Sequence, residues 1–305
     1  MTSNRSKRTG RAPRSVPPER RVRASAGGAV SAVAFTLIVL LVLLSFSRNR
    51  LWATDRGLWE DAVRKIPNKA RAHNNLGFVY NALGEYDRSL KEFGRSLELD
   101  PDNVTALLNR GVAYSEMKQF DRAIDDYTKA VTLTPSLSQG WFNRGFAYQE
   151  KGLLREAIRD FNRAIALDEG YRKAYRQRGF AHGDSGQYDR AAEDFDHVIA
   201  LSPDDAGAYL NRGTSYAGLG RVSMALADFD RAISIDPSFQ AAYLNRGNLH
   251  LRYGRYRHAV KDYSKVIALD PRSRVAYANR ALAYYRSGQV DKALRDRQTA
   301  KLLGR

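Results

Sequence analysis

One eight-residue stretch returns along most of the chain: Trp141-Phe142-Asn143-Arg144-Gly145-Phe146-Ala147-Tyr148. Its glycine has counterparts at steps of 34 residues, and an alanine closes the series: Gly77, Gly111, Gly179, Gly213, Gly247 and Ala281. Behind the stretch a small residue recurs at the same spacing, at Ser89, Ala123, Ala157, Ala191, Ala225, Ala259 and Ala293. An aromatic residue follows it, at Phe93, Tyr127, Phe161, Phe195, Phe229 and Tyr263. Such a strict period predicts a protein built of stacked structural repeats.

Each column has a physical reason. The glycine column lies on the first helix of a repeat, where the aromatic residue of the second helix crosses, and a missing Cβ lets the two helices approach closely. A second glycine column falls seven residues later, where a left-handed turn ends the first helix. It comprises Gly84, Gly152, Gly186, Gly220, Gly254 and Gly288, and Lys118 is its one departure. Proline ends most second helices, because the residue before proline is pushed out of the α region. Each repeat is therefore predicted to be a helical hairpin.

The repeat resembles the tetratricopeptide family. The quoted stretch, with Ala157 and Phe161, matches the aromatic, glycine, tyrosine and A-x3-F pattern of that family, except that Arg144 stands at the leucine place and Glu169 at the proline place. The resemblance covers residues 68–305, which hold seven copies. It implies an all-α fold, a right-handed α-solenoid of seven 34-residue helical hairpins, whose concave groove binds a protein or an extended peptide.

The N-terminal residues differ in character from the repeats. Residues 1–23 contain eight Lys and Arg and a single acid, Glu19, which predicts a disordered basic arm. From Gly27 to Phe46 the chain has 20 residues without a charge, enough for a helix about 30 Å long, so we expect a single transmembrane helix over residues 24–47. A cleaved signal peptide is the alternative, because Ser45-Phe46-Ser47 offers a small-residue cleavage site, but the apolar run exceeds the usual length.

Flanking charge predicts the orientation of this helix. Eight Lys and Arg precede it, and five stand in the 20 residues that follow. This bias places the arm in the cytoplasm and the repeats on the other side of the membrane, which is the periplasm in a bacterium. The chain has no cysteine, so disulfides do not report the compartment. We therefore expect a single-pass membrane protein whose basic arm touches anionic lipid headgroups.

The two ends of the repeat array are predicted to be covered. Residues 48–67 read as a linker and an N-terminal capping helix, the second helix of an incomplete repeat, which begins after Thr54 and ends before Pro67. Its apolar face would cover the first repeat. At the other end Arg297 replaces the packing aromatic residue, so we expect the array to be closed there too.

The sequence contains no constellation typical of an enzyme. The five histidines are scattered, and His73, His182 and His250 fall in columns otherwise held by packing aromatic residues, so we expect them to pack rather than to bind metal. Gly218-Leu219-Gly220 follows a helix and lacks the third glycine of a phosphate-binding loop. The net charge of +17 divides into +9 for residues 1–50 and +8 for the rest, a mild excess that does not favour nucleic acid as a partner. We expect no catalytic residue, metal or cofactor.

The sequence therefore predicts a non-catalytic, membrane-anchored scaffold that binds a protein or peptide in the groove of the solenoid. One alternative is a cytosol-facing receptor or co-chaperone that captures chaperone tails. Chaperone-binding members resemble Lys-x-x-Gly-Asn followed by Asn-Arg in the next repeat. Here Gly247-Asn248 and Asn279-Arg280 match, but Leu244 stands at the lysine place. A second alternative is a subunit that presents substrates to a separate transferase.

Two further columns predict ion pairs within the repeats. Arginine stands before the glycine place in six of the seven copies, and in the same six an aspartate stands before the aromatic place. The remaining copy has Leu76 and Glu92 instead. The expected pairs are Arg110–Asp126, Arg144–Asp160, Arg178–Asp194, Arg212–Asp228, Arg246–Asp262 and Arg280–Asp296.

The candidate binding residues lie on another stripe of the first helix, where asparagine recurs in six copies. Asparagine is a poor mid-helix residue, and its amide can pair with a peptide bond of any sequence, while variable neighbours leave room for selectivity. The column resembles the asparagine ladder that lines the superhelix of O-GlcNAc transferase. The alternative is that each asparagine bonds a neighbouring helix end. The predicted peptide-binding residues are Asn75, Asn109, Asn143, Phe146, Arg176, Phe180, Asn211, Asn245 and Asn279.

The charge bias gives a testable topology. Protease added to intact bacterial spheroplasts should digest residues 68–305, because eight Lys and Arg hold the arm on the cytoplasmic side. Immunoblotting against the repeats measures the digestion, and a cytoplasmic marker protein controls for leakage. Repeats that survive until the membrane is broken would mean the opposite orientation.

Overall fold

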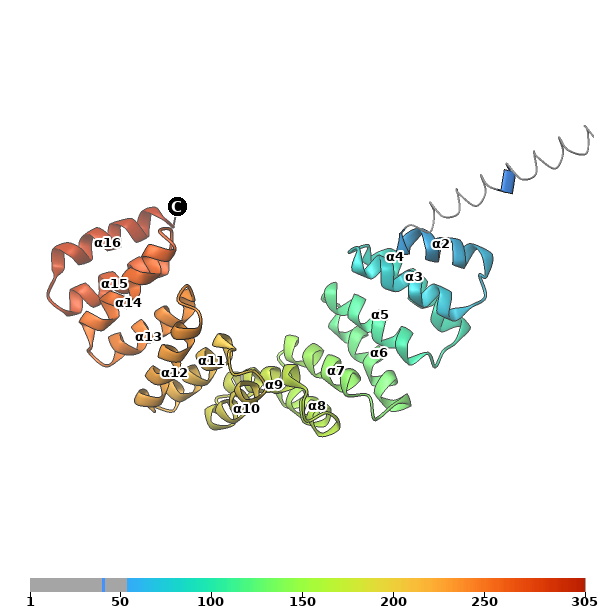
Figure 1. Ribbon diagram of the computed structural model, residues 1–305, viewed down its shortest axis with the longest axis horizontal. Helices are drawn as coiled ribbons and strands as arrows, with labels where there is room; N and C mark the ends of the chain where they lie inside the picture. The colour runs from blue at the N-terminus through green and yellow to red at the C-terminus, as the bar shows by residue number, and fades with distance from the viewer. Residues whose placement is uncertain (1–39, 42–53, 305) are drawn as a thin grey trace, which may run out of the picture. The chain divides into compact units, whose positions relative to one another are not determined.

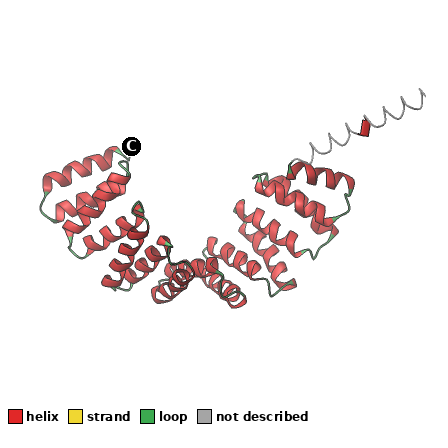
Figure 2. Cartoon of the chain, in the orientation of Figure 1, coloured by secondary structure: helices red, strands yellow, loops and turns green. Residues whose placement is uncertain are grey.

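The computed structural model describes residues 40–41 and 54–304, and all regular structure among them is helical (Figure 2). The predicted basic arm 1–23 lies outside the described residues, as does the predicted membrane helix 24–47 apart from Leu40 and Leu41. Within the described part of the chain, no helix is both long and apolar enough to cross a bilayer. The all-α repeat architecture is confirmed.

The chain divides into two compact units after Asp61. Helix α2, Asp55–Lys65, crosses this boundary. Its start agrees with the predicted cap, because the Thr54 hydroxyl accepts a hydrogen bond of 3.1 Å from the backbone N–H of Gly57. It ends two residues before Pro67.

The second unit consists of seven helical hairpins that follow one another along the chain (Figure 1). In each hairpin a first helix of 13 residues is followed, after a short turn, by a second helix of similar length. The pairs are α3 Ala70–Ala82 with α4 Tyr86–Leu99, α5 Val104–Glu116 with α6 Phe120–Leu133, α7 Ser138–Glu150 with α8 Leu154–Leu167, α9 Arg172–Asp184 with α10 Tyr188–Leu201, α11 Ala206–Gly218 with α12 Val222–Ile235, α13 Gln240–Arg252 with α14 Tyr256–Leu269, and α15 Arg274–Arg286 with α16 Val290–Leu302.

Within the first six hairpins the glycine and aromatic columns meet as predicted. A Cβ built on Gly111 would lie 2.5 Å from Tyr127 Cε1, and one built on Gly145 would lie 2.9 Å from Phe161 Cε1. No real Cβ tolerates such distances, so glycine is required for this helix spacing. The aromatic rings fill the space and are almost entirely buried, at Phe93, Tyr127, Phe161, Phe195, Phe229 and Tyr263.

The turn between the two helices is left-handed. The six glycines of the second column have φ between 70° and 81°, as predicted from their place at the helix end. Lys118, the one departure, adopts φ 58° at the same place. A side chain is strained in this region, so the fold imposes the turn even where the sequence lacks glycine.

Successive hairpins pack in a regular way. The second helix of each hairpin contacts the first helix of the next, from α4 with α5 to α14 with α15. First helices also contact one another, as at α3 with α5 and α11 with α13, whereas the described second helices show no comparable contact. The first helices therefore lie on the inner side of the stack, and the second helices lie on the outer side.

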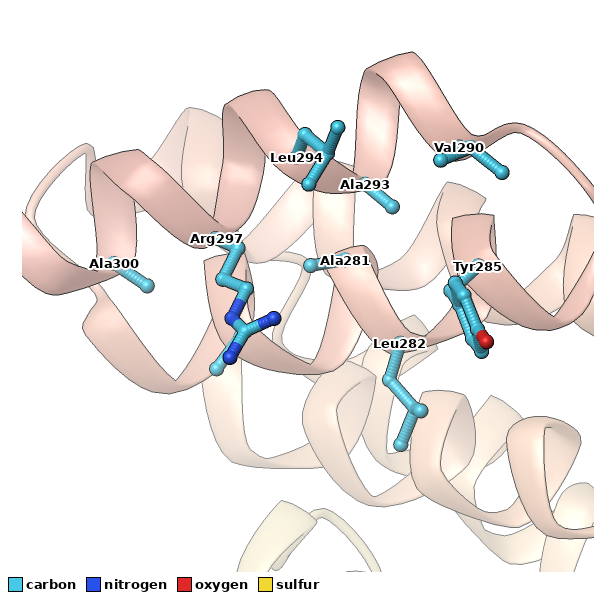
Figure 3. A pocket seen from close by; sticks show the side chains of 9 residues that line it. Ala281, Leu282, Tyr285, Val290, Ala293, Leu294, Arg297 and Ala300 are labelled. Atoms are coloured by element: carbon cyan, nitrogen blue, oxygen red, sulfur yellow. The ribbon is translucent and has the colours of Figure 1, made fainter.

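The C-terminal end of the stack departs from expectation. Residues of α15 and α16 enclose a hollow of about 510 Å³ (Figure 3). Its lining is mostly apolar, and Tyr285 and Leu294 are 64% and 57% exposed. The expectation that Arg297 closes the array is wrong, because the arginine lines the hollow without covering its leucine and valine side chains.

Gly145→Ala should lower the free energy of unfolding by roughly 1–3 kcal/mol, because the new methyl group would overpack Phe161 and the backbone oxygen of Ala157, 3.2 Å away. Gly94→Ala is the matched control: its Cβ would meet no atom within 4 Å, and better helix propensity should stabilise the protein by up to about 1 kcal/mol. Urea unfolding measures both values. A stabilising effect of both exchanges would contradict the close approach.

Candidate peptide-binding surface

A bidentate ion pair joins the two helices of six hairpins, as predicted. In the third hairpin, Arg144 Nε and Nη2 donate to the two carboxylate oxygens of Asp160 at 2.7 and 2.9 Å. The aspartate side chain is only 4% exposed, and that of the arginine 14%. Because the hydrogen bonds favour the charged guanidinium, they raise the pKa of Arg144. The same geometry occurs at Arg110–Asp126, Arg178–Asp194, Arg212–Asp228, Arg246–Asp262 and Arg280–Asp296.

All of these arginines except Arg110 also donate a hydrogen bond to the preceding hairpin. Arg144 Nη1 donates to Thr128 Oγ1 on α6 at 3.2 Å, and Arg178 Nη1 donates to Asn162 Oδ1 on α8 at 2.6 Å. Equivalent acceptors for the later arginines are Asp196, Asp230 and Ser264. One guanidinium therefore binds three helices of two hairpins. We call this unit, the arginine with its own aspartate and its acceptor in the preceding hairpin, the arginine clasp.

Aromatic rings enclose the clasp. The Arg144 guanidinium carbon lies 4.8 Å from the centre of the Trp141 ring and 5.8 Å from that of Tyr148, three and four residues away on the same helix. Tyrosine takes these places in most other hairpins, as at Tyr209 and Tyr216 around Arg212. Cation–π contact and the salt bridge together hold each arginine in one orientation.

The first hairpin has a different pair. Leu76 replaces the arginine, and the Nδ1 atom of His73 lies 2.7 Å from Glu92 Oε2. The Nε2 atom of the same ring lies 2.9 Å from the carbonyl oxygen of Pro67. The interpretation of His73 as only a packing residue is therefore incomplete: it takes over the role of the missing arginine towards the acidic residue of the second helix.

The other two histidines of these columns behave as packing residues. Burial lowers the pKa of His182 and of His250, and the Nδ1 atom of each ring is buried without a hydrogen-bond partner among the described residues. Burial also raises the pKa of Asp194, which lies 3.9 Å from His182, despite the hydrogen bonds from Arg178. Neutral rings therefore fit these sites best. No group of three or more potential metal ligands occurs in the described part of the chain.

The asparagine column lies where successive first helices meet. Asn109 Nδ2 donates to Asn74 Oδ1 at 3.1 Å, and Asn279 Nδ2 donates to Asn248 Oδ1 at 2.9 Å. Asn245 Nδ2 reaches Thr214 Oγ1 at 3.3 Å. Each bond joins a first helix to the preceding first helix, so the column lies on the inner side of the stack. The predicted alternative, in which asparagine bonds a helix end, is not the contact observed here.

These bonds leave the column with free hydrogen-bonding capacity. All six asparagines are partly exposed: Asn75, Asn109, Asn143, Asn211, Asn245 and Asn279. In the three bonds just described the asparagine is the donor, so its carbonyl oxygen stays available. The Nδ2 atom of Asn143 is itself buried without a partner among the described residues. A peptide backbone next to this column would find both donors and acceptors.

The three predicted binding residues that are not asparagines make other contacts than the asparagine column. Phe146 packs partly buried against the core of its own hairpin, and the Phe180 ring meets Phe195 edge-on with centroids 5.5 Å apart. Arg176 pairs with Asp205, which also caps α11, so its charge is already engaged in joining two hairpins. Phe78 belongs to the variable neighbours of the asparagine column but was not among the predicted binding residues, and it is 57% exposed in the same column as Phe146. Phe78 differs from Phe146 and Phe180 in its greater exposure, and the sequence alone does not show how exposed a side chain is.

Seven helical hairpins of this geometry define a helical-repeat binding scaffold. Models of the tetratricopeptide repeat match residues 68–136, 138–171, 176–238 and 241–273, about two thirds of the chain. The chain therefore belongs to the tetratricopeptide repeat family. No curated protein matches its sequence.

Solved structures are similar over the repeats. A crystal structure of MamA is 27% identical with a TM-score of 0.53, over 55% of this chain and 92% of that one. YrrB, described as a TPR protein with an unusual peptide-binding site, is 26% identical with a TM-score of 0.54, over 60% of this chain and 95% of that one. A tetratricopeptide repeat protein from Parabacteroides merdae shares the fold at 22% identity and a TM-score of 0.54, over 78% of this chain and 94% of that one.

Arg144→Ala should lower the free energy of unfolding by roughly 3–5 kcal/mol, because it leaves the carboxylate of Asp160 buried without a cation. Arg159→Ala removes an exposed arginine from the same hairpin and should change stability by less than about 0.5 kcal/mol. Urea unfolding of both variants gives the comparison. A loss below about 1 kcal/mol for Arg144→Ala, as for a surface pair, would show that the clasp does not support the fold.

Proposed function

We propose that this chain is a non-catalytic scaffold that binds an extended segment of a partner protein along its first helices. One observation carries the proposal: six hairpins present a partly exposed asparagine at the same place on the inner side of the stack. Its amide can donate to and accept from a peptide backbone whatever the peptide sequence. The description of YrrB as a protein with a peptide-binding site supports this class of ligand.

Selectivity would come from the residues beside the asparagines. Three positions after each asparagine, and after Gln177 in the fourth hairpin, the side chain differs from hairpin to hairpin. These residues are Phe78, Val112, Phe146, Phe180, Thr214, Asn248 and Leu282. Apolar side chains dominate the first four hairpins, and polar ones occupy the fifth and sixth. We expect a ligand whose apolar residues contact the N-terminal hairpins and whose polar residues contact Thr214 and Asn248.

The proposal includes a membrane anchor. Residues 24–47 carry no charge, and the basic arm before them favours a non-cytoplasmic position for the repeats and contact of the arm with anionic lipid. The partner would then be a periplasmic or membrane protein. The spheroplast experiment described above tests this part of the proposal separately from peptide binding.

The chaperone-receptor alternative receives no support from the residues that suggested it. Asn248 Oδ1 already accepts from Tyr263 Oη at 2.8 Å and from Asn279 Nδ2 at 2.9 Å. Arg280 is engaged in its arginine clasp with Asp296 and Ser264. The carbonyl oxygen of Asn248 and the guanidinium of Arg280 are therefore already engaged, and Leu244 supplies no cation for a carboxylate tail. The substrate-presenting subunit of a transferase stays an alternative that a co-purified enzyme would support.

Replacing Asn109, Asn143, Asn211 and Asn245 together by alanine should abolish partner capture in affinity purification from solubilised membranes. Each of these residues is partly exposed, so circular dichroism and thermal melting should stay near wild type. Quantitative mass spectrometry of the captured partner measures the loss.

The matched control replaces four exposed residues of one column on the second helices, Asp125, Arg159, Glu193 and Lys261, by alanine. This outer-face variant should capture the partner as wild type does. Full capture by the folded asparagine variant would place the binding surface elsewhere, and unfolding of that variant would assign the asparagines to structure.

A further inference from the structure

The end face of the last hairpin carries a second apolar surface, which adjoins the asparagine column only at Leu282, three residues after Asn279. Four of its residues are about half exposed: Leu282 44%, Tyr285 64%, Val290 49% and Leu294 57%. They surround the hollow of about 510 Å³ together with Arg297, and in Figure 3 Leu294 and Val290 come from one helix and Leu282 and Tyr285 from the other. We call these five residues the C-terminal face. Contiguous exposed apolar surface of this kind marks a docking site.

The equivalent surface of the preceding hairpin shows what kind of element covers such a surface inside the stack. One repeat earlier, the places of Tyr285, Leu294 and Arg297 are held by Leu251, Val260 and Tyr263. There the ring of Tyr263 is entirely buried, and Leu251 and Val260 pack with it against Ala283 of the next first helix. Ala276, two turns earlier on that helix, covers Val266. The surface is therefore shaped to receive an α-helix that presents a stripe of small residues.

The charge of the C-terminal face selects among possible helices. Arg297 stands where the interior hairpins have a buried aromatic ring, and it forms no ion pair with any residue in the described part of the chain. Lys301 follows it on the same stripe of α16. A second copy of this face would bring like charges together, which disfavours pairing. A covering helix with a carboxylate opposite Arg297 would instead neutralise the charge while it buries the leucines.

We propose that the C-terminal face docks an amphipathic α-helix of a partner protein, whose stripe of small residues bears an aspartate or glutamate opposite Arg297. The stack would thereby bind two partners, or two parts of one, at two surfaces that adjoin at Leu282. The helix would occupy the position that α15 holds on α14, so that its acidic residue lies where Ala283 lies over Tyr263.

This geometry specifies a probe. The probe is a fluorescent peptide with the sequence of α15, the exchange Ala283→Glu, and glutamine in place of its three arginines. The glutamate is then its one charged side chain, and it stands at the required place. Cross-linking on the opposite side keeps it helical, because helices of 13 residues are marginal in water. The same peptide with Ala283→Lys is its control. Fluorescence anisotropy measures binding of both to the full chain in mild detergent.

The wild-type chain should bind the glutamate peptide at least about tenfold more tightly than the lysine peptide, and Arg297→Glu should reverse this preference. Leu294→Asp should weaken binding by at least about tenfold, whereas Leu201→Asp, at a leucine exposed to a similar extent on α10, should leave it unchanged. The asparagine variant should bind these peptides as wild type does, so this test is independent of the proposed groove.

Three results would overturn the proposal: no saturable binding of either peptide up to about 1 mM, binding that Leu294→Asp and Arg297→Glu both leave unchanged, or self-association of the chain that Leu294→Asp abolishes. The last result, seen by analytical ultracentrifugation, would assign the face to a second copy of the chain.

Discussion

A carboxylate buried in each second helix from α6 onward constrains how the hairpins pack. Asp160 is almost inaccessible to water, and a charge at that depth is tolerated only with a cation and a full set of hydrogen bonds. The arginine of the first helix provides both, and from Arg144 onward its third nitrogen also binds the preceding hairpin. Each arginine clasp therefore defines the register within a hairpin and the spacing to its neighbour. Because the pair is directional, it selects one arrangement where apolar packing alone would permit several.

The arginine clasp also explains why the residues on one side of a first helix are nearly the same in every hairpin, whereas residues on the other side vary. The stripe of glycine, arginine and aromatic residues meets the second helices and is nearly the same in every hairpin. The asparagines of the other stripe contact neighbouring first helices through single hydrogen bonds such as that from Asn109 to Asn74. A bond of this kind contributes about 0.5–1.5 kcal/mol and can be exchanged for one to a peptide. The first helices can thus bind a ligand while the clasps keep the stack intact.

Much of this structure could be predicted from the sequence, because its main constraints are local and repeated. Steric contact requires glycine at Gly145 and its counterparts, and a charge pair needs arginine and aspartate at two fixed places. The third contact of the clasp was missed because its acceptor varies in type between Thr128, Asn162 and Ser264. A column whose residue type changes from hairpin to hairpin shows no recurring pattern in the sequence.

Two other features depend on three-dimensional neighbours. The pairing of His73 with Glu92 requires knowing that the histidine lies beside the second helix, although it occupies an aromatic column. The C-terminal face was misjudged because Arg297 suggested a solvated end, whereas the side chains around it stayed apolar. One charged residue in a packing column indicates the end of an array, but it does not show how much apolar surface that end exposes.

Every first helix has a packing side and a proposed binding side. Hydrogen exchange of the chain with and without its captured partner tests this separation most directly. Partner binding should slow exchange in the first helices α5, α7, α11 and α13, where partly exposed asparagines lie, and should leave the outer helices α6, α8, α12 and α14 unchanged. Slowed exchange confined to those second helices would contradict the account, because it would place the partner on the outer side of the stack.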